Sequence, residues 1–578
     1  MKNSFYVAAA AVLSGLCLLR PVHAQNAPAA PPDQAAPAAA PAFDPAKLVP
    51  GSSLFYIHLN EDAILNWIAE MKTTTLGKDV QAMIAAQQAK NPMAKNLGMA
   101  MALTKGFAHE AGFGMMPPTD PAAKTPPEMV AVIPIVSMND VQPEVALVTR
   151  MMAGNGQVTW KTEPEGDYTV HVATGQQKPG QTEPAYALLP DALVVGSDAQ
   201  MVHNSLKLVA NPVDSMASST QLQALAPEID QTQALWGFLN TAAYINTVSA
   251  LSGGKGPNPL TLPSFKNLMA AYRGEAFSLA LKPDRLEIQA ALGVDPNSTL
   301  GKLAPTLQPT PLKAPDLAFE QSVAFFDIPN VPALAPVFND VYKPIVADMQ
   351  KMAGAQANNP QIGDMMNNVF DLISGIFNNS GNEIAIDVGP LTPGMTMPRA
   401  LLMIQNSDKP GLQTAMDKVL NGIQALTGQK WFPTTVLDTT IQILGPAGSP
   451  LRPAFGKAGG FDILGLDEAA IKTPIYLAAG KGGGRSLSAN PEYQHVTQLL
   501  GTQAIGSNFI NLHDIAQFVM ALAPEADIAK ARQQPGSQIG FELLNDLRSI
   551  GGAYLPSTSG FKSKGIITFD PNAAAPAQ

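Results

Sequence analysis

The residues best suited to chemistry are the histidines that lie beyond the first 24 positions of this 578-residue chain. They are His58, His109, His171, His203, His495 and His513. A zinc-protease helix needs two histidines four positions apart with a glutamate after the first. No pair has that spacing, and neighbours such as His109 and Glu110 point to opposite faces of a strand. We therefore expect no metal site and no cofactor.

Nucleophilic catalysis has no recognisable motif either. The chain lacks the Gly-x-Ser-x-Gly turn that presents the serine of many hydrolases. A catalytic triad is defined by geometry and not by order, so a hydrolase without a motif stays as a third hypothesis. The only cysteine, Cys17, lies in the N-terminal apolar segment, so the rest of the chain has no thiol and no disulfide. We predict that the protein is not an enzyme.

Three further features combine charge or sulfur with close spacing. Residues 480–485 are glycine-rich with two cations but lack P-loop spacing, and we interpret them as a long hairpin turn. Met93 and Met116 bound a methionine cluster that favours core packing over Cu(I) binding. Closely spaced carboxylates are interpreted as helix caps and solvated charge. They are Glu61 and Asp62, Glu163 and Glu165, and Glu525 and Asp527.

The N-terminus has the three parts of a secretory signal. Lys2 supplies the positive start, residues 5–19 are apolar, and small residues precede a cleavage site between Ala24 and Gln25. The apolar run is shorter than the roughly 20 residues of a membrane span. An uncleaved anchor is the rival interpretation. Cleavage of residues 1–24 predicts a periplasmic or secreted protein with no transmembrane span, and the net charge of −10 argues against nucleic-acid partners.

Proline-rich segments divide the remaining chain. Residues 25–46 predict a disordered Ala/Pro linker, residues 297–317 a second linker, and residues 572–578 a disordered tail. Residues 47–296 and 318–571 then form two domains of similar length. Their matches recur at offsets of 269 to 277 and predict two diverged copies of one domain. The matches pair 53–59 with 322–328, 130–135 with 400–405, 238–240 with 509–511, and 274–277 with 551–554.

Hydrophobic periodicity predicts the elements of each copy. Apolar residues at three- and four-residue spacing predict helices around 334–345, 362–377 and 410–423, with weaker counterparts around 64–71 and 145–152. Alternation predicts strands at 383–388 and 285–290. Short connections favour antiparallel pairing. We expect an α+β fold of two tandem copies, each a mainly antiparallel, possibly curved sheet with helices packed on one face.

Two short motifs resemble a group of exported bacterial proteins of unknown function that are built from tandem α+β repeats. One is the Val-Pro turn before the opening strand, at residues 48–52, and the other is the hairpin Asp-Ala-Leu-Val-Val-Gly at residues 191–196. The second copy departs from the hairpin pattern at its glycine loop. The resemblance implies no catalytic residues.

The leading hypothesis is an exported non-enzymatic protein, a binding or envelope-associated component with an unknown partner. The alternative is a periplasmic carrier of a lipid or other apolar ligand. Phe370, Ile373 and Phe377 are compatible with lining a cavity in such a carrier.

Overall fold

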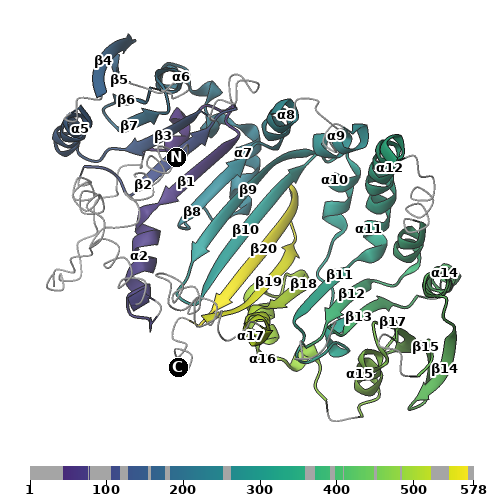
Figure 1. Cartoon of the computed structure of the whole chain (residues 1–578). Coiled ribbons are helices and arrows are strands. Elements are labelled where there is room, and N and C mark those ends of the chain that lie inside the picture. Colours follow the sequence, from purple (N-terminus) through teal and green to yellow (C-terminus); the bar gives the residue numbers. More distant parts are fainter. Residues whose placement is uncertain are drawn as a thin grey trace. The chain divides into compact units, whose positions relative to one another are not determined.

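The structure is a computed structural model with an α+β fold, shown in Figure 1. It describes residues 43–75, 77–78, 106–117, 128–153, 158–175, 183–251, 262–357, 371–390, 398–407, 409–447, 452–481, 484–522 and 546–570. The predicted signal, most of the first linker and the tail lie outside these residues. The chain divides into unit 1, Met1–Gly253 with Arg273–Pro283, and unit 2, Gly254–Tyr272 with Asp284–Gln578.

Unit 1 contains an antiparallel sheet. Its described strands pair in the order β9-β8-β1-β2-β3-β7-β6-β5-β4. They are β1 (Phe55–Asn60), β2 (Glu110–Met115), β3 (Met129–Pro134), β4 (Val158–Glu165), β5 (Tyr168–Gly175), β6 (Ala185–Leu188), β7 (Ala192–Gly196), β8 (Leu235–Leu239) and β9 (Tyr272–Leu281). The helices are α2 (Glu61–Met71), α5 (Met138–Ala153), α6 (Ala199–Ala210), α7 (Thr220–Leu225) and α8 (Thr241–Leu251), with short turns η1 (Pro45–Leu48), η4 (Pro212–Asp214), η5 (Met216–Ser218) and η6 (Ala226–Glu228).

Unit 2 repeats this strand order and adds two strands. Its described strands pair as β10-β20-β19-β18-β11-β12-β13-β17-β16-β15-β14. They are β10 (Arg285–Val294), β11 (Ala324–Pro329), β12 (Glu383–Val388), β13 (Ala400–Gln405), β14 (Trp431–Val436), β15 (Thr439–Leu444), β16 (Ala454–Ala458), β17 (Phe461–Gly465), β18 (Ile505–Asn511), β19 (Leu547–Leu555) and β20 (Gly560–Phe569). The nine strands from β19 to β14 in this order correspond one by one to the nine strands from β9 to β4 in unit 1, and the two added strands are β10 and β20.

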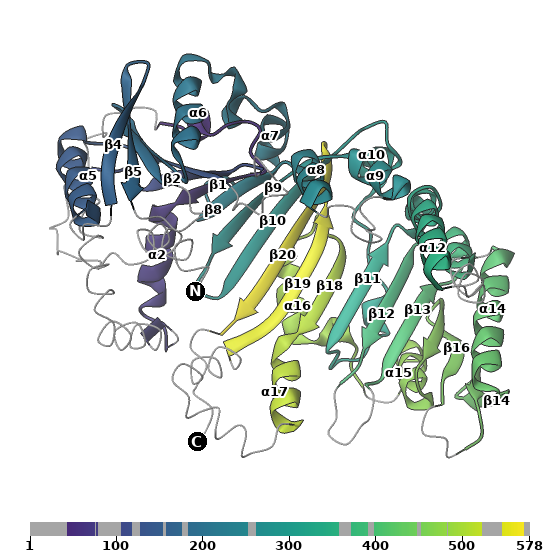
Figure 2. The same cartoon turned by 45° about the horizontal axis from the view of Figure 1, so that its top comes forward.

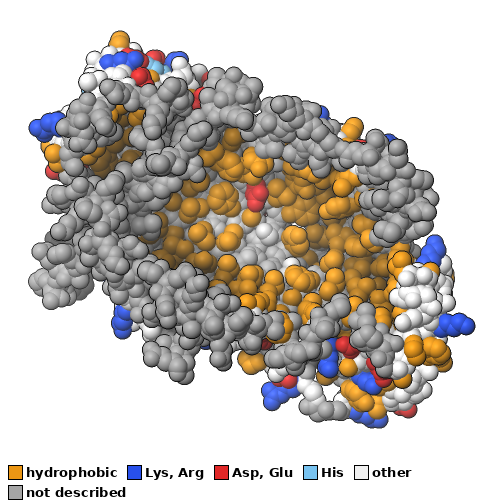
Figure 3. Space-filling model, in the orientation of Figure 1, with side chains coloured by type: hydrophobic (Ala, Val, Ile, Leu, Met, Phe, Trp, Pro, Cys, Tyr) orange, Lys and Arg blue, Asp and Glu red, His pale blue; other side chains and the backbone are white. Residues whose placement is uncertain are grey.

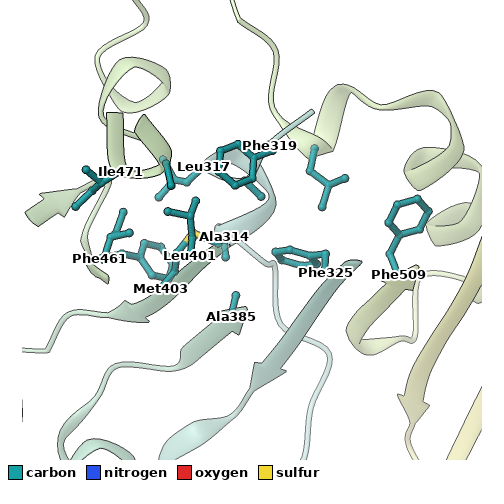
Figure 4. Packing of buried hydrophobic residues seen from close by; sticks show 14 of the residues in the cluster. Ala314, Leu317, Phe319, Phe325, Ala385, Leu401, Met403, Phe461, Ile471 and Phe509 are labelled. Atoms are coloured by element: carbon teal, nitrogen blue, oxygen red, sulfur yellow. The ribbon is translucent and has the colours of Figure 1, made fainter. Parts of the chain in front are cut away.

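The helices of unit 2 lie on both faces of its sheet, so the predicted one-sided packing is wrong for this unit. Ile471 of α15 joins a cluster with Phe325, Leu401 and Phe461, shown in Figure 4. Leu412 of α14 joins a second cluster with Ile384 and Ile404, whose side chains point to the opposite face of the sheet. The helical elements are α9 (Pro263–Ala270), α10 (Thr299–Leu303), η8 (Ala304–Thr306), η9 (Ala314–Asp316), α11 (Val331–Val337), η10 (Phe338–Tyr342), α12 (Lys343–Ala357), residues 371–379, α14 (Pro410–Thr427), α15 (Glu468–Ala478), η11 (Leu487–Ala489), α16 (Pro491–Leu500) and α17 (Leu512–Leu522).

Residues 480–485 lie between the helical elements α15 and η11 and not between two paired strands, so the hairpin predicted there is wrong. They follow α15, and Gly480 adopts a left-handed φ of 64° while its N–H donates to Leu477 O at 3.0 Å, a helix end. The counterpart of the β6–β7 hairpin is instead β16–β17. It belongs to the sheet whose strands β11, β12 and β13 lie side by side in Figure 2. An aspartate begins the next helix in both units: Asp198 accepts from Met201 N and Asp467 from Ala470 N. The apolar run 475–478 is short, so its composition could not distinguish helix from strand.

Candidate functional site

The central strands of unit 2 have an inverted alternation of polar and apolar side chains. On β11 the Asp327 carboxyl is buried while the neighbouring Phe326 is 39% exposed. On β12 Asp387 is fully buried while Ile386 is 44% exposed. A strand with one solvated face normally turns its polar residues outward. Here the carboxylates face the core, and apolar side chains face outward.

The buried carboxylates hold the segment that precedes β11. Glu383 accepts hydrogen bonds from the backbone N–H of Lys313 and of Ala314, the latter at 2.7 Å. Asp387 accepts from Phe319 N at 2.8 Å and from Ser322 Oγ at 2.6 Å. These bonds satisfy donors that would otherwise be buried without partners. The carboxylates therefore have a structural role on the covered face.

Burial changes how these acids ionise. It raises the pKa of Asp387 to about 7, against the lowering effect of its two hydrogen bonds. It also raises the pKa of Asp327 to about 9, with the neighbouring Glu383 adding to the rise. An acid pair of this kind can serve general acid–base chemistry. Asp327 and Glu383 are 6% and 3% exposed, however, so the pair is closed to a substrate in this structure.

Two in-register rows of side chains cross the opposite face of the same strands. We call these fourteen residues the open face. The first row is Ala400, Val388, Ala324, Ile510, Ile550, Ile567 and Leu286. The second row is Leu402, Ile386, Phe326, Asn508, Gly552, Gly565 and Ile288. Neither row contains a charged residue, every member is at least partly exposed, and Asn508 is the one polar side chain in them.

Two adjacent glycines leave the middle of the second row of the open face without side chains. Gly552 and Gly565 are cross-strand partners. A Cβ atom at Gly552 would have its nearest neighbour at 3.8 Å, and one at Gly565 at 4.0 Å. The adjacent Gly551 differs completely, because its Cβ would meet Val496 of α16 at 2.1 Å. The two successive glycines therefore mark the open and the covered side of one strand.

Packed clusters border the open face at two places. At one end of β10 and β20, Leu292 and Phe561 pack with Leu300 of α10 and Val337 of α11. On β12 and β13, Ile384 and Ile404 lie beneath Leu412 and Met416 of α14. Leu402, at the end of the second row, packs against the α14 cluster, and the other thirteen residues of the open face belong to neither cluster. Figure 3 shows apolar side chains, in orange, gathered over these strands.

Tyrosines add polar groups beside this apolar surface. Tyr554 of β19 is 53% exposed and follows Gly552 on the same side of its strand. The pKa of Tyr272 is raised by burial and, to a smaller extent, by Tyr342 and Tyr554, which places the three rings in one neighbourhood. Tyrosine suits a boundary between apolar and aqueous surroundings, because its ring is apolar and its hydroxyl is polar.

Unit 1 has a similar apolar side with one difference. Met129, Met115, Phe55 and Leu239 form an in-register row across β3, β2, β1 and β8. The row reaches Glu275 of β9, opposite Leu239. Burial raises the pKa of this half-buried carboxyl. The same ladder position in unit 2 is Ile550, which lies opposite Ile510.

The structure distributes the histidines over separate places. His58 Nε2 lies 3.4 Å from Glu110, and the His58 ring stacks on Trp236. His203 lies between Glu163 and Glu165, at 3.1 and 2.8 Å. His109 pairs with Asp62. The other three are also apart: His171 stacks on Tyr186, His513 Nδ1 lies 2.9 Å from Arg548, and His495 is on α16. Within the described residues, no group of three acidic, histidine or cysteine side chains is arranged to hold a metal ion.

The structure also shows where several other residues singled out in the sequence lie. Glu61 and Asp62 occupy the first turn of α2, as predicted for helix-start carboxylates. Glu163 and Glu165 lie on strand β4 and not in a turn. Phe377 stacks on Phe338 with ring centroids 5.1 Å apart, and it packs against the α14 cluster. The pair Glu525 and Asp527, the residue Phe370 and the methionine Met93 lie outside the described residues.

Sequence reasoning missed the open face. The available signal lay in β11 and β12. Their alternation is clear, but it does not show whether the acids or the large apolar residues face the core. Alternation identifies two faces and does not say which one is covered. No helix among the described residues is long and apolar enough to cross a membrane.

Comparison with known proteins yields structural matches alone. No protein-family model matches the chain, and no curated protein matches it. Crystal form III of TP0453, a protein of Treponema pallidum, has a TM-score of 0.24 and 9% identity over 44% of this chain and 82% of that chain. Form I has a TM-score of 0.23 and 9% identity, covering 45% and 81%. Form IV has a TM-score of 0.24 and 8% identity, covering 46% and 85%. Similarity at this level assigns no function.

Proposed function

We propose that this protein is an exported, non-enzymatic binding protein whose open face holds the acyl chain of a lipid or of a similar apolar ligand. The observation that carries the proposal is the inverted alternation of β11 and β12. It leaves Phe326 and Ile386 exposed while Asp327 and Asp387 are buried. A contiguous exposed apolar surface is a mark of an interaction site. Covering it with an apolar ligand would remove that area from water.

The dimensions of the open face favour an extended chain. Each row crosses seven strands, and strands lie 4.7–4.9 Å apart, so a row is about 28 Å long. An acyl chain in one leaflet spans about half of a hydrocarbon core that is roughly 30 Å thick, or about 15 Å. One row therefore has room for such a chain, and the missing side chains at Gly552 and Gly565 let it lie close to the sheet there.

Export and duplication are part of the same proposal. The predicted signal, with cleavage between Ala24 and Gln25, supports a periplasmic or secreted location. The shared strand order of the two units supports descent from one α+β repeat. Each of the four sequence matches that predicted this falls on a pair of strands with the same place in that order: β1 with β11, β3 with β13, β8 with β18, and β9 with β19.

A binding titration tests the proposal. We expect the full-length protein to saturate with an environment-sensitive fluorescent fatty-acyl probe. Ile386→Asp should weaken binding at least about tenfold, because a carboxylate beneath an apolar chain must lose hydration. The matched control is Phe432→Asp, which changes a 49% exposed apolar residue of β14, outside the open face. That variant should bind as the unmodified protein does.

Three outcomes would contradict the proposal. The first is the absence of saturable binding by the unmodified protein, and the second is equal weakening by Ile386→Asp and Phe432→Asp. The third is robust turnover in a panel of hydrolase substrates, which would contradict the non-enzymatic part. Circular dichroism of both variants checks that neither loses its fold.

A further inference from the structure

We infer that the apolar side of unit 1 binds an amphiphile with a cationic polar group, and that the Glu275 carboxylate is its counter-ion. The inference rests on the proposed function, because it requires an apolar chain to lie on a sheet face. It adds the charge of the ligand and a residue that recognises it.

The surroundings of Glu275 carry the argument. Its cross-strand partner is Leu239, whose own partner on the next strand is Phe55. Phe277 follows two positions later on the same side of β9, opposite Gly237. Glu275 is half-buried, and within the described residues no cation pairs with it. Arg273, on the same side of β9, is exposed and takes part in another interaction.

A half-buried carboxylate without a cation beside it has lost part of its hydration, and nothing replaces it. Burial of an ionised group is costly unless an opposite charge or hydrogen-bond donors accompany it. The fold does not require the charge, because the corresponding ladder position in unit 2 is Ile550. A bound ammonium group would offset the lost hydration while its alkyl chain lies over Leu239, beside the edge-to-face ring pair of Phe55 and Tyr244. The net charge of −10 also attracts cations over anions.

The test compares three probes that share one chain length: dodecylammonium, dodecanol and dodecanoate, each below its micelle-forming concentration. Binding is measured calorimetrically on the full-length chain carrying Ile386→Asn, an uncharged polar substitution that weakens apolar binding to the open face of unit 2 without adding a carboxylate there. We expect dodecylammonium to bind at least fivefold more tightly than dodecanol, and dodecanoate to bind more weakly than both. Adding Glu275→Gln should retain dodecanol binding and abolish the preference for the ammonium. Adding Glu183→Gln instead changes an exposed carboxylate elsewhere in unit 1 and should keep the preference.

The possible failures are distinguishable. Dodecanol binding without an ammonium preference would overturn the inference and leave the proposed function standing. A preference that survives Glu275→Gln would also overturn it, because the charge would then act from elsewhere. If the protein without any substitution binds none of the three probes, the proposed function fails first, and the inference fails with it.

Discussion

The two units share a strand order and differ in how they place charge. In unit 1, His58 and Glu110 form a partly exposed pair on neighbouring strands. The corresponding strands of unit 2 carry Asp327 and Glu383, both buried. On the other side, unit 1 carries Glu275 where unit 2 carries Ile550. One arrangement of strands thus supports an open face without charged residues in one unit and a corresponding face that carries Glu275 in the other.

The largest difference should appear as a pH dependence of unit 2. The folded pKa of Asp387 is about 7 and that of Asp327 about 9, both above the ordinary value for aspartate. The folded state therefore holds more protons than the unfolded state, so stability is fully present below about pH 4 and falls as pH rises. For Asp387 the loss is complete above about pH 7 and amounts to roughly 4 kcal/mol.

Hydrogen exchange measures this effect by peptide. We expect peptides covering β11 and β12 to be better protected at pH 5 than at pH 8, after correction for intrinsic exchange rates. Asp387→Asn should flatten part of that dependence. Equal protection of these strands at both pH values would contradict the assignment of the acids to the covered face.

The second-largest difference between the units should appear in the loss of stability when a carboxylate is removed from each. Glu383→Ala deletes the acceptor for the N–H groups of Lys313 and Ala314, and should cost about 3 kcal/mol. Glu110→Ala removes a side chain that is 24% exposed, and should cost less than about 1 kcal/mol. Pulse proteolysis in urea, with the fragments assigned by mass, reports the two units separately. Similar costs at the two positions would weaken the comparison.

Successive glycines of β19 provide a smaller and sharper contrast. Gly551→Ala should destabilise the protein by about 2 kcal/mol, because the added methyl group meets the stiff side chain of Val496. Gly552→Ala points to the open face and should be neutral or stabilising by about 0.5 kcal/mol. Chemical denaturation of the two variants checks the signs. A destabilising Gly552→Ala would mean that the open face is covered.

Much of the architecture could be predicted from residue patterns. The helix begins at Pro410 as predicted, and the strands predicted at 383–388 and 285–290 are confirmed. The match of 274–277 with 551–554 falls on the right pair of strands but is out of register. Ala276 lies opposite Phe238, whereas Gly551 and not Ala553 lies opposite Phe509. A shift of two residues keeps every side chain on its face, so alternation alone could not reveal it.

The open face could not be predicted, for a physical reason. Its residues come from β10, β11, β12, β13 and β18–β20, which are distant in sequence, and each strand alone looks like an ordinary half-buried strand. Which side is covered depends on where α14, α15 and α16 pack. The acids at 327 and 387 look like solvent-facing residues until the backbone N–H and hydroxyl groups that surround them are known.

Photolabelling tests the central claim most directly. An alkyl diazirine bound to the full-length protein is activated by light, and the modified residues are identified by peptide mass spectrometry. We predict labels on the open face, at Ile288, Phe326 and Ile550, that an excess of unlabelled alkyl ligand suppresses. Labels that fall elsewhere, or that resist competition, would contradict the proposal that this face holds an apolar chain.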